Sequence, residues 1–423
     1  MPRIINGTTA LVLVLDAIGI PTIEYILNNH KGSINLPNLA SMGLGKLLDV
    51  KFQDRIRSSD DSFAVALEQA SVSADSVIGH REMVGVIDTR SYNLFHQGFP
   101  KEYIHRLEER IRRRLIFNRM AGGDKAIELN YEEHEKTGHP IIYASICDPI
   151  AQIAMNEDTI PVEEQHRIAE IALNLATEMD LGMNRVISRA YTRHEGVIKR
   201  TENRHDATLP IEQKTLVDIL KLQGVQTAAV AKVGDLIPGF YDKLKYTSKD
   251  ELDEKLGLKF VHPERKDTNP YSAQATVKAL LDAKEKERPK GSLILSNFVD
   301  TDALYGHPHN IEGIVKCLEE ADRVIGIIQN SYLMLGDVII VTADHGMKYK
   351  NDLGYIYGFH NKEPVPLLVR MKGYLRWPQE FTLRNSKTFA SVGDLVSQIF
   401  RCSDRYIEEC SLRDYFTHET GCE

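Results

Sequence analysis

An aspartate and a histidine stand side by side at the end of an apolar run. The run covers 338–341, and Asp344 and His345 follow it in "DVIIVTADHG". Burying a carboxylate is costly unless a partner neutralises its charge. A metal ion is one such partner, because carboxylate oxygen and imidazole nitrogen both bind divalent cations. The pair therefore indicates a metal site at the end of a buried strand.

The same residue types follow two other apolar runs. Asp16 ends the run "ALVLVL" (10–15), Asp302 and His307 follow the run over 291–299, and His360 lies in a later loop. Ligands bind at the carboxyl ends of strands in open α/β sheets. We therefore expect these side chains to meet at one edge and to hold two divalent ions. For any single aspartate, a turn or a helix N-cap is the plainer alternative.

A serine with a possible chemical role lies in "SVSADSVIGHREMVG" (71–85). Ser76 follows Asp75 and precedes Gly79 and His80. A capping serine at a helix start is the plainer interpretation. As a nucleophile, a serine hydroxyl needs a base or a metal ion to activate it. Beside two metal ions, Ser76 would be activated without a histidine base.

Composition limits the classes of protein that this chain can be. Its 423 residues suffice for one large core and a second domain, and 42% hydrophobic with 26% charged residues is typical of a globular protein. A net charge of −8 argues against nucleic acid or a membrane surface as the main partner. The apolar run over 10–15 is too short to span a bilayer, and no signal peptide is expected. Five cysteines without a CxxC pair, at 147, 317, 402, 410 and 422, are typical of a reducing cytoplasm.

Strands and helices are expected to alternate at both ends of the chain. Buried strands are predicted within 9–19, 225–235, 291–300 and 337–344, and helices over 215–223, 272–287 and 310–334, the last with Asn310 as N-cap. A further helix is predicted over 162–179, in the middle of the chain. Continuous apolar runs are typical of a mostly parallel sheet covered on both faces. The pattern predicts one doubly wound α/β domain flanked by helices.

The middle of the chain has a different character. From about residue 97 it becomes rich in charge, and an arginine-rich, strand-like piece covers 184–206. We expect 97–208 to form a smaller inserted α+β cap domain. Residues 1–96 and 209–423 would then form the metal-binding catalytic core.

Four motifs together resemble the phosphopentomutases, a family in the alkaline-phosphatase superfamily of metalloenzymes. They are "VTADHG", "NFVDTDALYGH", "DSVIGHRE" and "KRTENRHD", and the resemblance extends to 36–45, 132–145 and 386–400. It implies an alkaline-phosphatase-like core and a phosphomutase that moves phosphate between O1 and O5 of ribose or deoxyribose. The partner would be a small phosphosugar, and a sugar bisphosphate would prime the enzyme by phosphorylating Ser76.

The resemblance also assigns roles position by position. One metal would be surrounded by Asp16, Ser76, Asp344 and His345, and the second held by Asp302, His307 and His360. Phosphosugar contacts would come from Asp148, Arg189 and Arg204 in the cap and from Lys232 on the core side. Arginine is well suited to phosphate, although a solvated face is the plainer interpretation of these arginines. The family is typically manganese-dependent, and spacing alone leaves Zn²⁺ and Mg²⁺ open.

The chain departs from the family pattern around the nucleophile. The family usually has threonine in a "DTxTGHWE"-like run, whereas Ser76 stands here and Arg81 replaces the tryptophan. The segment after Asp16 is shorter, and the loop between His345 and His360 is a few residues longer. Two alternatives follow: a metal-dependent phosphatase or a mutase for another phosphosugar, and a catalytically silent sugar-phosphate sensor. The intact set of metal ligands argues against the sensor.

Overall fold

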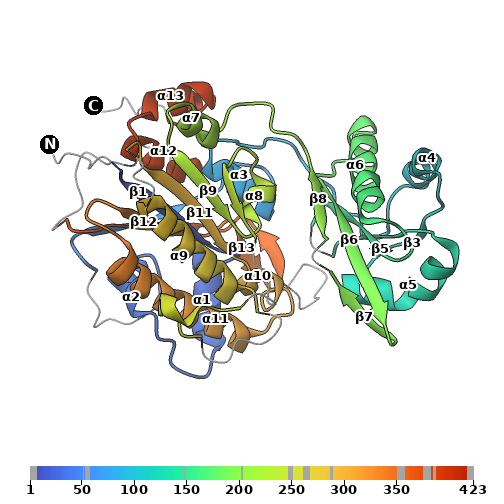
Figure 1. The fold of residues 1–423 in the computed structure, drawn as a ribbon, viewed down its shortest axis with the longest axis horizontal. Helices are drawn as coiled ribbons and strands as arrows, with labels where there is room; N and C mark the ends of the chain where they lie inside the picture. The colour runs from blue at the N-terminus through green and yellow to red at the C-terminus, as the bar shows by residue number, and fades with distance from the viewer. Residues whose placement is uncertain are drawn as a thin grey trace. The chain divides into compact units, whose positions relative to one another are not determined.

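The computed structural model describes residues 7–50, 52, 58–146, 148–201, 203–245, 251–260, 267–285, 289–349, 358–374, 383 and 387–416. The chain forms two compact units, which are Met1–Thr89 with Glu212–Glu423 (unit 1) and Arg90–Ile211 (unit 2) (Figure 1). Unit 2 is thus an insertion in unit 1. Cys317, Cys402 and Cys410 are buried free thiols. Cys147, Cys422 and residues 350–357 of the loop before His360 lie outside the described residues.

Unit 1 is built on a seven-stranded sheet in the order β10-β9-β11-β1-β12-β15-β2. The strands are β1 (Thr9–Leu15), β2 (Ser62–Leu67), β9 (Gln226–Val230), β10 (Asp242–Leu244), β11 (Ser292–Phe298), β12 (Val338–Thr342) and β15 (Val365–Met371). Strands from β10 to β12 pair in parallel, whereas β15 is antiparallel to both β12 and β2. The predicted mostly parallel α/β sheet is confirmed, and β1, β9, β11 and β12 are the four predicted strands. A separate hairpin joins β13 (Gly346–Lys348) to β14 (Phe359–Asn361).

Helices cover this sheet, and every residue of β1, β11 and β12 is buried. In the described part of unit 1 the α-helices are α1 (Ile20–Asn29), α2 (Pro37–Ser41), α3 (Ser76–Met83), α7 (Leu216–Leu222), α8 (Val233–Leu236), α9 (Asn269–Glu285), α10 (Asp300–Ala303), α11 (Ile311–Ile327), α12 (Ala390–Ile399) and α13 (Ser403–Glu409). Helix α9 packs against β9 and β11 (Figure 1). Asn310 caps α11 as predicted, since its side chain accepts a hydrogen bond from the Gly313 N–H at 3.0 Å. Within the described residues, no helix combines the length and apolar character needed to cross a membrane.

The carboxyl ends of the parallel strands lie at one edge of the sheet. Val14 of β1 pairs with Asn297 of β11 on one side and with Thr342 of β12 on the other. The reversed strand β15 begins at the edge where β2 ends, because Val365 pairs with Leu67. The loops after β1, β2, β11 and β12 and the loop before β15 therefore all reach this edge.

Unit 2 has a sheet in the order β3-β4-β5-β6-β7, with β8 also paired to β6. Its elements are β3 (Ile116–Met120), β4 (Ile141–Ala144), β5 (Ile150–Asn156), β6 (Arg185–His194), β7 (Val197–Arg200), β8 (His205–Thr208), α4 (Lys101–Ile111), α5 (Gly123–Thr137) and α6 (Val162–Glu178). Alternate strand residues separate into two clusters. Ile142 and Ile153 pack with α4 and α6, whereas Tyr143 and Ala154 pack with α5. The other side chains on the α5 face include Gln152, which is paired to Tyr143 across β4 and β5.

The segments that lead to and from the insertion are joined within unit 1. The side-chain amide of Gln213 donates to the carbonyl oxygen of Gly85 at 2.7 Å. The backbone N–H of Leu216 donates to the carbonyl oxygen of Val84 at 2.9 Å. Both ends of the insertion are therefore held next to each other by hydrogen bonds.

Candidate functional site

Asp16 and Asp344 lie close together after the adjacent strands β1 and β12, and both are fully buried. The Nε2 of His345 lies 3.6 Å from Asp16 Oδ1 and 3.6 Å from Asp344 Oδ2. Its Nδ1 lies 3.1 Å from the carbonyl oxygen of Gly346, which can only accept, so Nε2 presents a lone pair. Burial lowers the pKa of His345 to about 4, which keeps the ring neutral at pH 7. Neutral imidazole is the form that binds a metal ion.

Ser76 lies beside these residues as the first residue of α3, and it is 4% exposed. Its neighbour Asp75 caps the helix by accepting a hydrogen bond from the Val77 N–H at 2.7 Å. The plainer interpretation of Ser76 as the capping residue is therefore wrong. The Ser76 hydroxyl instead lies 3.2 Å from His345 Nε2 and accepts a hydrogen bond from Lys232 Nζ at 2.8 Å.

Lys232 brings a positive charge to the same cluster from the end of β9. Its ammonium forms an ion pair with Asp16 Oδ2 and lies 3.8 Å from Asp344 Oδ2. Ala17 and Ala231, which are next to Asp16 and Lys232 in the chain, have left-handed φ angles of 62° and 60°. This conformation costs a non-glycine residue roughly 1–2 kcal/mol and is often found beside functional sites. Both site residues thus project from strained turns.

A second group of candidate ligands follows β11. Asp302 Oδ1 lies 3.5 Å from His307 Nε2 and 3.3 Å from His360 Nε2, and the two histidine rings are stacked 5.0 Å apart. His307 Nδ1 donates to the carbonyl oxygen of Gly358 at 2.8 Å, so its Nε2 carries a lone pair. Burial alone would raise the pKa of Asp302, but His307 and His360 lower it well below its usual value. Asp302 is therefore a carboxylate.

Two overlapping sets of ligand atoms can each surround a divalent cation. The ligand atoms of Asp302, His307 and His360 lie within 4.8 Å of one another, and so do those of Asp16, Asp302 and His345. Asp16 Oδ1 is buried and accepts no hydrogen bond from the described residues. Burial and the charge of Asp344 raise the pKa of Asp16 well above its usual value. The carboxylate lacks a full set of partners, which a bound cation would supply.

Two polar residues in this cluster were not predicted to have a role. His80 on α3 places its Nδ1 3.2 Å from Asp344 Oδ2 and 2.8 Å from the carbonyl oxygen of Ser76. Asn297 near the end of β11 donates to Asp16 Oδ2 at 3.0 Å. Each residue therefore orients a candidate ligand. A large polar side chain near the end of a mostly apolar strand was the available signal for Asn297.

Helix α3 packs closely on the loop that carries Asp344. A Cβ at Gly79 would lie 1.9 Å from the carbonyl oxygen of Asp344, so this approach requires glycine. Arg81, which replaces the tryptophan of the family pattern, is buried and donates from Nε to the carbonyl oxygen of Leu236 at 3.0 Å. Leu236 ends α8, which begins directly after Lys232. Arg81 thus connects the helix of Ser76 to the element that carries Lys232.

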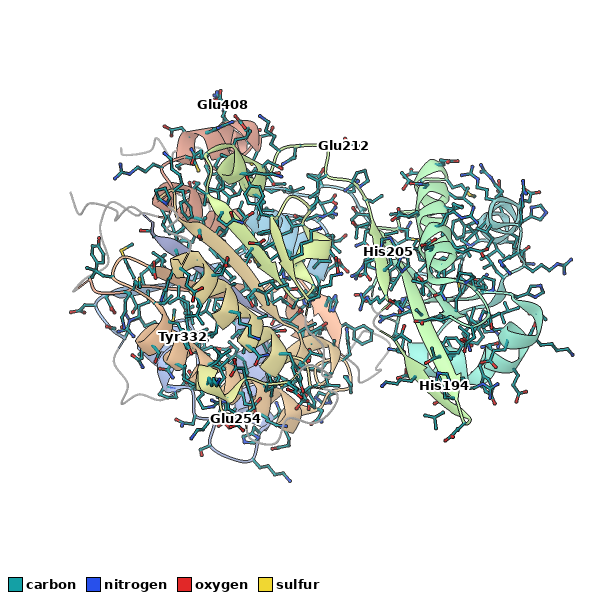
Figure 2. The ribbon with its side chains drawn as sticks, viewed as in Figure 1. His194, His205, Glu212, Glu254, Tyr332 and Glu408 are labelled. Atoms are coloured by element: carbon teal, nitrogen blue, oxygen red, sulfur yellow. The ribbon has the colours of Figure 1, made fainter. Side chains whose placement is uncertain are left out.

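In unit 2, Arg204 and Arg185 both bind the carboxylate of Asp206. Arg204 forms a fork, with Nε 2.5 Å from Oδ1 and Nη2 2.7 Å from Oδ2, and Arg185 Nη1 lies 3.1 Å from Oδ2. Burial would raise the pKa of Asp206, but the arginines lower it well below its usual value. Arg185 is 7% exposed and Arg204 is 43% exposed, so the cluster is not a uniformly solvated face. Arg204 directly precedes β8, whose first residue is His205 (Figure 2).

Arg189 and Asp148 complete the residues predicted in unit 2. Arg189 of β6 is half-buried and donates from Nε to Gln152 Oε1 at 2.8 Å. Burial and the nearby Arg204 lower the pKa of Arg189 to about 9. Asp148 lies in the turn between β4 and β5, is 8% exposed, and accepts a hydrogen bond from Ser145 Oγ at 3.2 Å. Arg189 and Arg204 therefore belong to one charged cluster, and Asp148 lies at a turn of the same sheet.

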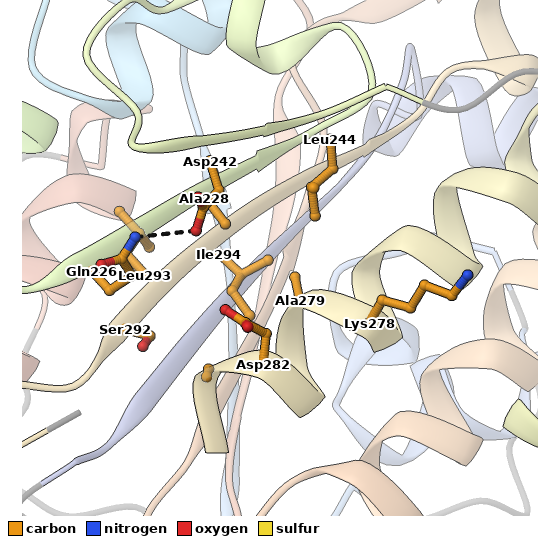
Figure 3. A pocket seen from close by; sticks show the side chains of 11 residues that line it. Gln226, Ala228, Asp242, Leu244, Lys278, Ala279, Asp282, Ser292, Leu293 and Ile294 are labelled. Atoms are coloured by element: carbon orange, nitrogen blue, oxygen red, sulfur yellow. Dashed lines mark hydrogen bonds between the residues drawn. The ribbon is translucent and has the colours of Figure 1, made fainter. Parts of the chain in front are cut away.

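A cavity of about 260 Å³ lies elsewhere in unit 1, between α9 and strands β9, β10 and β11 (Figure 3). Its lining combines apolar residues with Gln226, which donates to Asp242 Oδ2 at 3.1 Å. None of the predicted site residues is among the described residues that line it. Gln226 and Ser292 begin their strands, so the cavity lies toward the opposite edge of the sheet from Asp16. The candidate site is therefore the Asp/His cluster and not this cavity.

This arrangement defines a class of metal-dependent enzyme, and a comparison with protein families agrees. Residues 8–404 match the model of the Metalloenzyme superfamily, to which the chain belongs. The sequence is 33% identical to a phosphopentomutase of Thermotoga petrophila, over 92% of this chain and 95% of that protein. It is 32% identical to a phosphopentomutase of Dictyoglomus turgidum, over 95% of this chain and 97% of that protein. Within the superfamily, the chain is a member of the phosphopentomutase family.

Among solved structures, the fold is similar to a phosphoglycerate mutase of Leishmania mexicana. The two are 12% identical, the match covers 99% of this chain and 97% of that chain, and the TM-score is 0.45. The family identified from sequence motifs is confirmed by the sequence comparisons, as is the prediction of an enzyme. The hypothesis of a silent sensor is correspondingly disfavoured.

Proposed function

We propose that this enzyme interconverts ribose 1-phosphate and ribose 5-phosphate, or their deoxyribose counterparts, through a phosphorylated Ser76. The observation that carries the proposal is the position of the Ser76 hydroxyl. It lies 2.8 Å from the Lys232 ammonium and 3.2 Å from His345 Nε2, next to the buried pair Asp16 and Asp344. A hydroxyl among cations and metal ligands is the arrangement that phosphoryl transfer requires.

Two divalent ions are proposed to bind the two ligand sets. Asp16, Ser76, Asp344 and His345 would surround one ion, and Asp302, His307 and His360 the other, with Asp302 close enough to contribute to both. When bound, such ions neutralise phosphoryl oxygens and stabilise the charge of in-line displacement. The unpartnered Asp16 Oδ1 supports this assignment. A mixed oxygen and imidazole set suits Mn²⁺, which is the metal that we propose.

The residues of the chain then have distinct tasks. The phosphoryl group leaves Ser76 Oγ as its P–O bond breaks, and a new P–O bond forms to the free O5 or O1 hydroxyl of the pentose phosphate. The resulting bisphosphate reorients and returns its other phosphate to Ser76. Lys232, which contacts Ser76 Oγ, would hold a phosphoryl oxygen during both transfers. Priming by a sugar bisphosphate would supply the first phosphate on Ser76.

We propose that unit 2 supplies the recognition of the phosphosugar through Arg189, Arg204 and Asp148. Guanidinium groups bind phosphate oxygens in forked geometry, and a carboxylate accepts hydrogen bonds from sugar hydroxyls. The fork between Arg204 and Asp206 holds one guanidinium in place before substrate arrives. Half-buried Arg189 is oriented by Gln152.

The proposal is tested with Mn²⁺-loaded protein that has been primed with a ribose bisphosphate. Incubation with ribose 1-phosphate is expected to yield ribose 5-phosphate at equilibrium, with little inorganic phosphate. Intact-mass spectrometry after priming is expected to show one added phosphate that maps to Ser76. Release of inorganic phosphate without the isomer would instead identify a phosphatase, the alternative that the Ser76 and Arg81 departures raise.

A further inference from the structure

Three loops of the candidate metal centre meet at a carboxylate that is outside the ligand set. Glu363 lies between His360 and the start of β15. Its Oε1 accepts hydrogen bonds from the backbone N–H of Thr22, at 2.8 Å, and from the Thr22 hydroxyl. Its Oε2 accepts a hydrogen bond from Asn361 Nδ2 at 2.9 Å. Thr22 lies in the first turn of α1, which follows the Asp16 loop, so Glu363 joins that loop to the His360 loop.

The side chain of Glu363 is also wedged against two glycine backbones. A Cβ at Gly19 would lie 2.3 Å from Glu363 Oε1, and a Cβ at Gly346 would lie 1.9 Å from Glu363 Cγ. Gly19 lies three residues after Asp16, and Gly346 directly follows His345. The Glu363 side chain, as it lies in the structure, leaves no room for a Cβ at either glycine. The side chain of Glu363 therefore lies in close contact with both loops.

Thr22 extends this contact to the hairpin that carries His360. The backbone N–H of Met347 donates to Thr22 Oγ1 at 2.8 Å. Met347 is in turn paired with His360 across β13 and β14. A continuous set of hydrogen bonds and strand pairing thus leads from Glu363 through Thr22 to the loops of His345 and His360.

We propose that Glu363 is a positioning residue that holds the Asp16, His345 and His360 loops at the spacing that both metal ions require. Because this role presupposes the two-metal assignment proposed above, its effect is expected on metal affinity rather than on phosphoryl transfer alone. Loss of a residue that orients ligands typically weakens metal binding by about 10- to 100-fold. Since Glu363 contacts elements of both ligand sets, both ions are expected to bind more weakly.

The test measures Mn²⁺ binding to metal-free, full-length protein by calorimetry and by electron paramagnetic resonance of free Mn²⁺. Glu363→Ala removes the carboxylate and its hydrogen bonds, whereas Glu363→Gln keeps an oxygen acceptor for Thr22 and loses the charge. Asp337→Asn is the matched control. Asp337 is a buried acid that accepts hydrogen bonds from the N–H groups of Thr9, at 2.8 Å, and Met334, at 2.7 Å. Asp337 thus joins the amino-terminal ends of β1 and β12, whereas the candidate ligands follow the carboxyl-terminal ends of these strands.

Support would consist of a dissociation constant at least tenfold higher for both ions in Glu363→Ala, with Glu363→Gln within about threefold of wild type and Asp337→Asn unchanged. If wild type binds two ions and Glu363→Ala binds Mn²⁺ with unchanged affinity, the positioning role of Glu363 is overturned, and the two-metal proposal still stands. Equal losses in the alanine and glutamine variants would attribute the effect to charge and overturn positioning. A similar loss of Mn²⁺ affinity in Asp337→Asn would show that the effect of Glu363→Ala is general destabilisation of the fold, which overturns positioning. Wild-type protein that binds no Mn²⁺ would overturn the proposed metal centre and this role together.

Discussion

The ammonium group of Lys232 lies 2.8 Å from the hydroxyl oxygen of Ser76 and forms an ion pair with Asp16. The protein itself therefore supplies a positive charge to the oxygens that would also surround the first metal ion. Charge placed in advance around a reacting hydroxyl lowers the cost of reorganisation during phosphoryl transfer.

Ser76→Ala is expected to lower kcat by at least about 1,000-fold, because no hydroxyl remains to carry the phosphate. Mn²⁺ affinity should change by less than about tenfold, since the carboxylate and imidazole ligands remain. Ser76→Thr restores the residue usual in the family and should keep kcat within about tenfold. Formation of ribose 5-phosphate and Mn²⁺ titration measure both quantities. Full turnover in the alanine variant would place the nucleophile elsewhere.

Lys232→Met is expected to destabilise the metal-free protein by about 3 kcal/mol, because the buried carboxylates of Asp16 and Asp344 lose their ion partner. Added Mn²⁺ should recover most of this loss. Urea unfolding in chelator and in excess Mn²⁺ measures the difference. Lys245→Met is the control, since Lys245 pairs with Asp235 on the surface and should contribute less than about 1 kcal/mol. A Lys232→Met protein as stable as wild type in chelator would contradict the pairing.

Asp302→Asn and His307→Ala are expected to differ in the number of ions bound. The ligand atoms of Asp302 are close to both sets, whereas those of His307 belong to one. His307→Ala should therefore lose one ion, and Asp302→Asn should weaken both. Wild-type protein at 100 times the dissociation constant should gain about 2.7 kcal/mol of stability per site, which chelator removes. Equal stoichiometry in the two variants would argue against a shared Asp302.

Asp206→Asn is expected to lower the free energy of unfolding by about 3 kcal/mol at pH 7, because Arg185 and Arg204 lose a buried anionic partner. The folded pKa of Asp206 lies below its unfolded value, so its stabilising effect is present above the ordinary carboxyl pKa near 4 and disappears as pH falls through the folded pKa. The difference between wild type and variant should therefore shrink in acid. Unfolding curves from pH 7 to pH 3 measure it.

The surface pair of Asp124 and Arg200 supplies the control for that experiment. Asp124 is 80% exposed, so Asp124→Asn should change stability by less than about 1 kcal/mol at any of these pH values. A pH-independent difference between wild type and Asp206→Asn would show that shape, and not charge, accounts for the loss.

Much of the candidate metal centre was predictable because its residues follow recognisable strands. Parallel strands align their carboxyl ends, so Asp16 and Asp344 had to approach one another once β1 and β12 became neighbours. Lys232 reaches the same edge because it follows β9, which is parallel to β11. The buried strands themselves were indicated by continuous apolar runs of strand length, which are typical of a sheet covered on both faces.

Other features depend on partners that are distant in the chain and leave little trace in local sequence. The reversed strand β15 was not predicted, although its direction brings Glu363 to the ligand edge. The capping role of Asp75, which frees the Ser76 hydroxyl, depends on a backbone angle that the two residue types do not distinguish. The closeness of Asp302 to both ligand sets follows from the packing of loops, for which spacing along the chain carries no information.

The hydrogen bonds of Gln213 to Gly85 and of Leu216 to Val84 hold the two ends of the insertion together, so that unit 2 is a closed loop of the chain. The entropy of closing a loop grows only slowly with its length, so the size of the inserted segment matters little to the stability of the unit 1 sheet. A change in the length of unit 2 is therefore expected to leave the Asp/His cluster of unit 1 in place. With the sugar contacts proposed for unit 2 and the phosphoryl transfer proposed for unit 1, the preference for a sugar could change without a change in the chemistry.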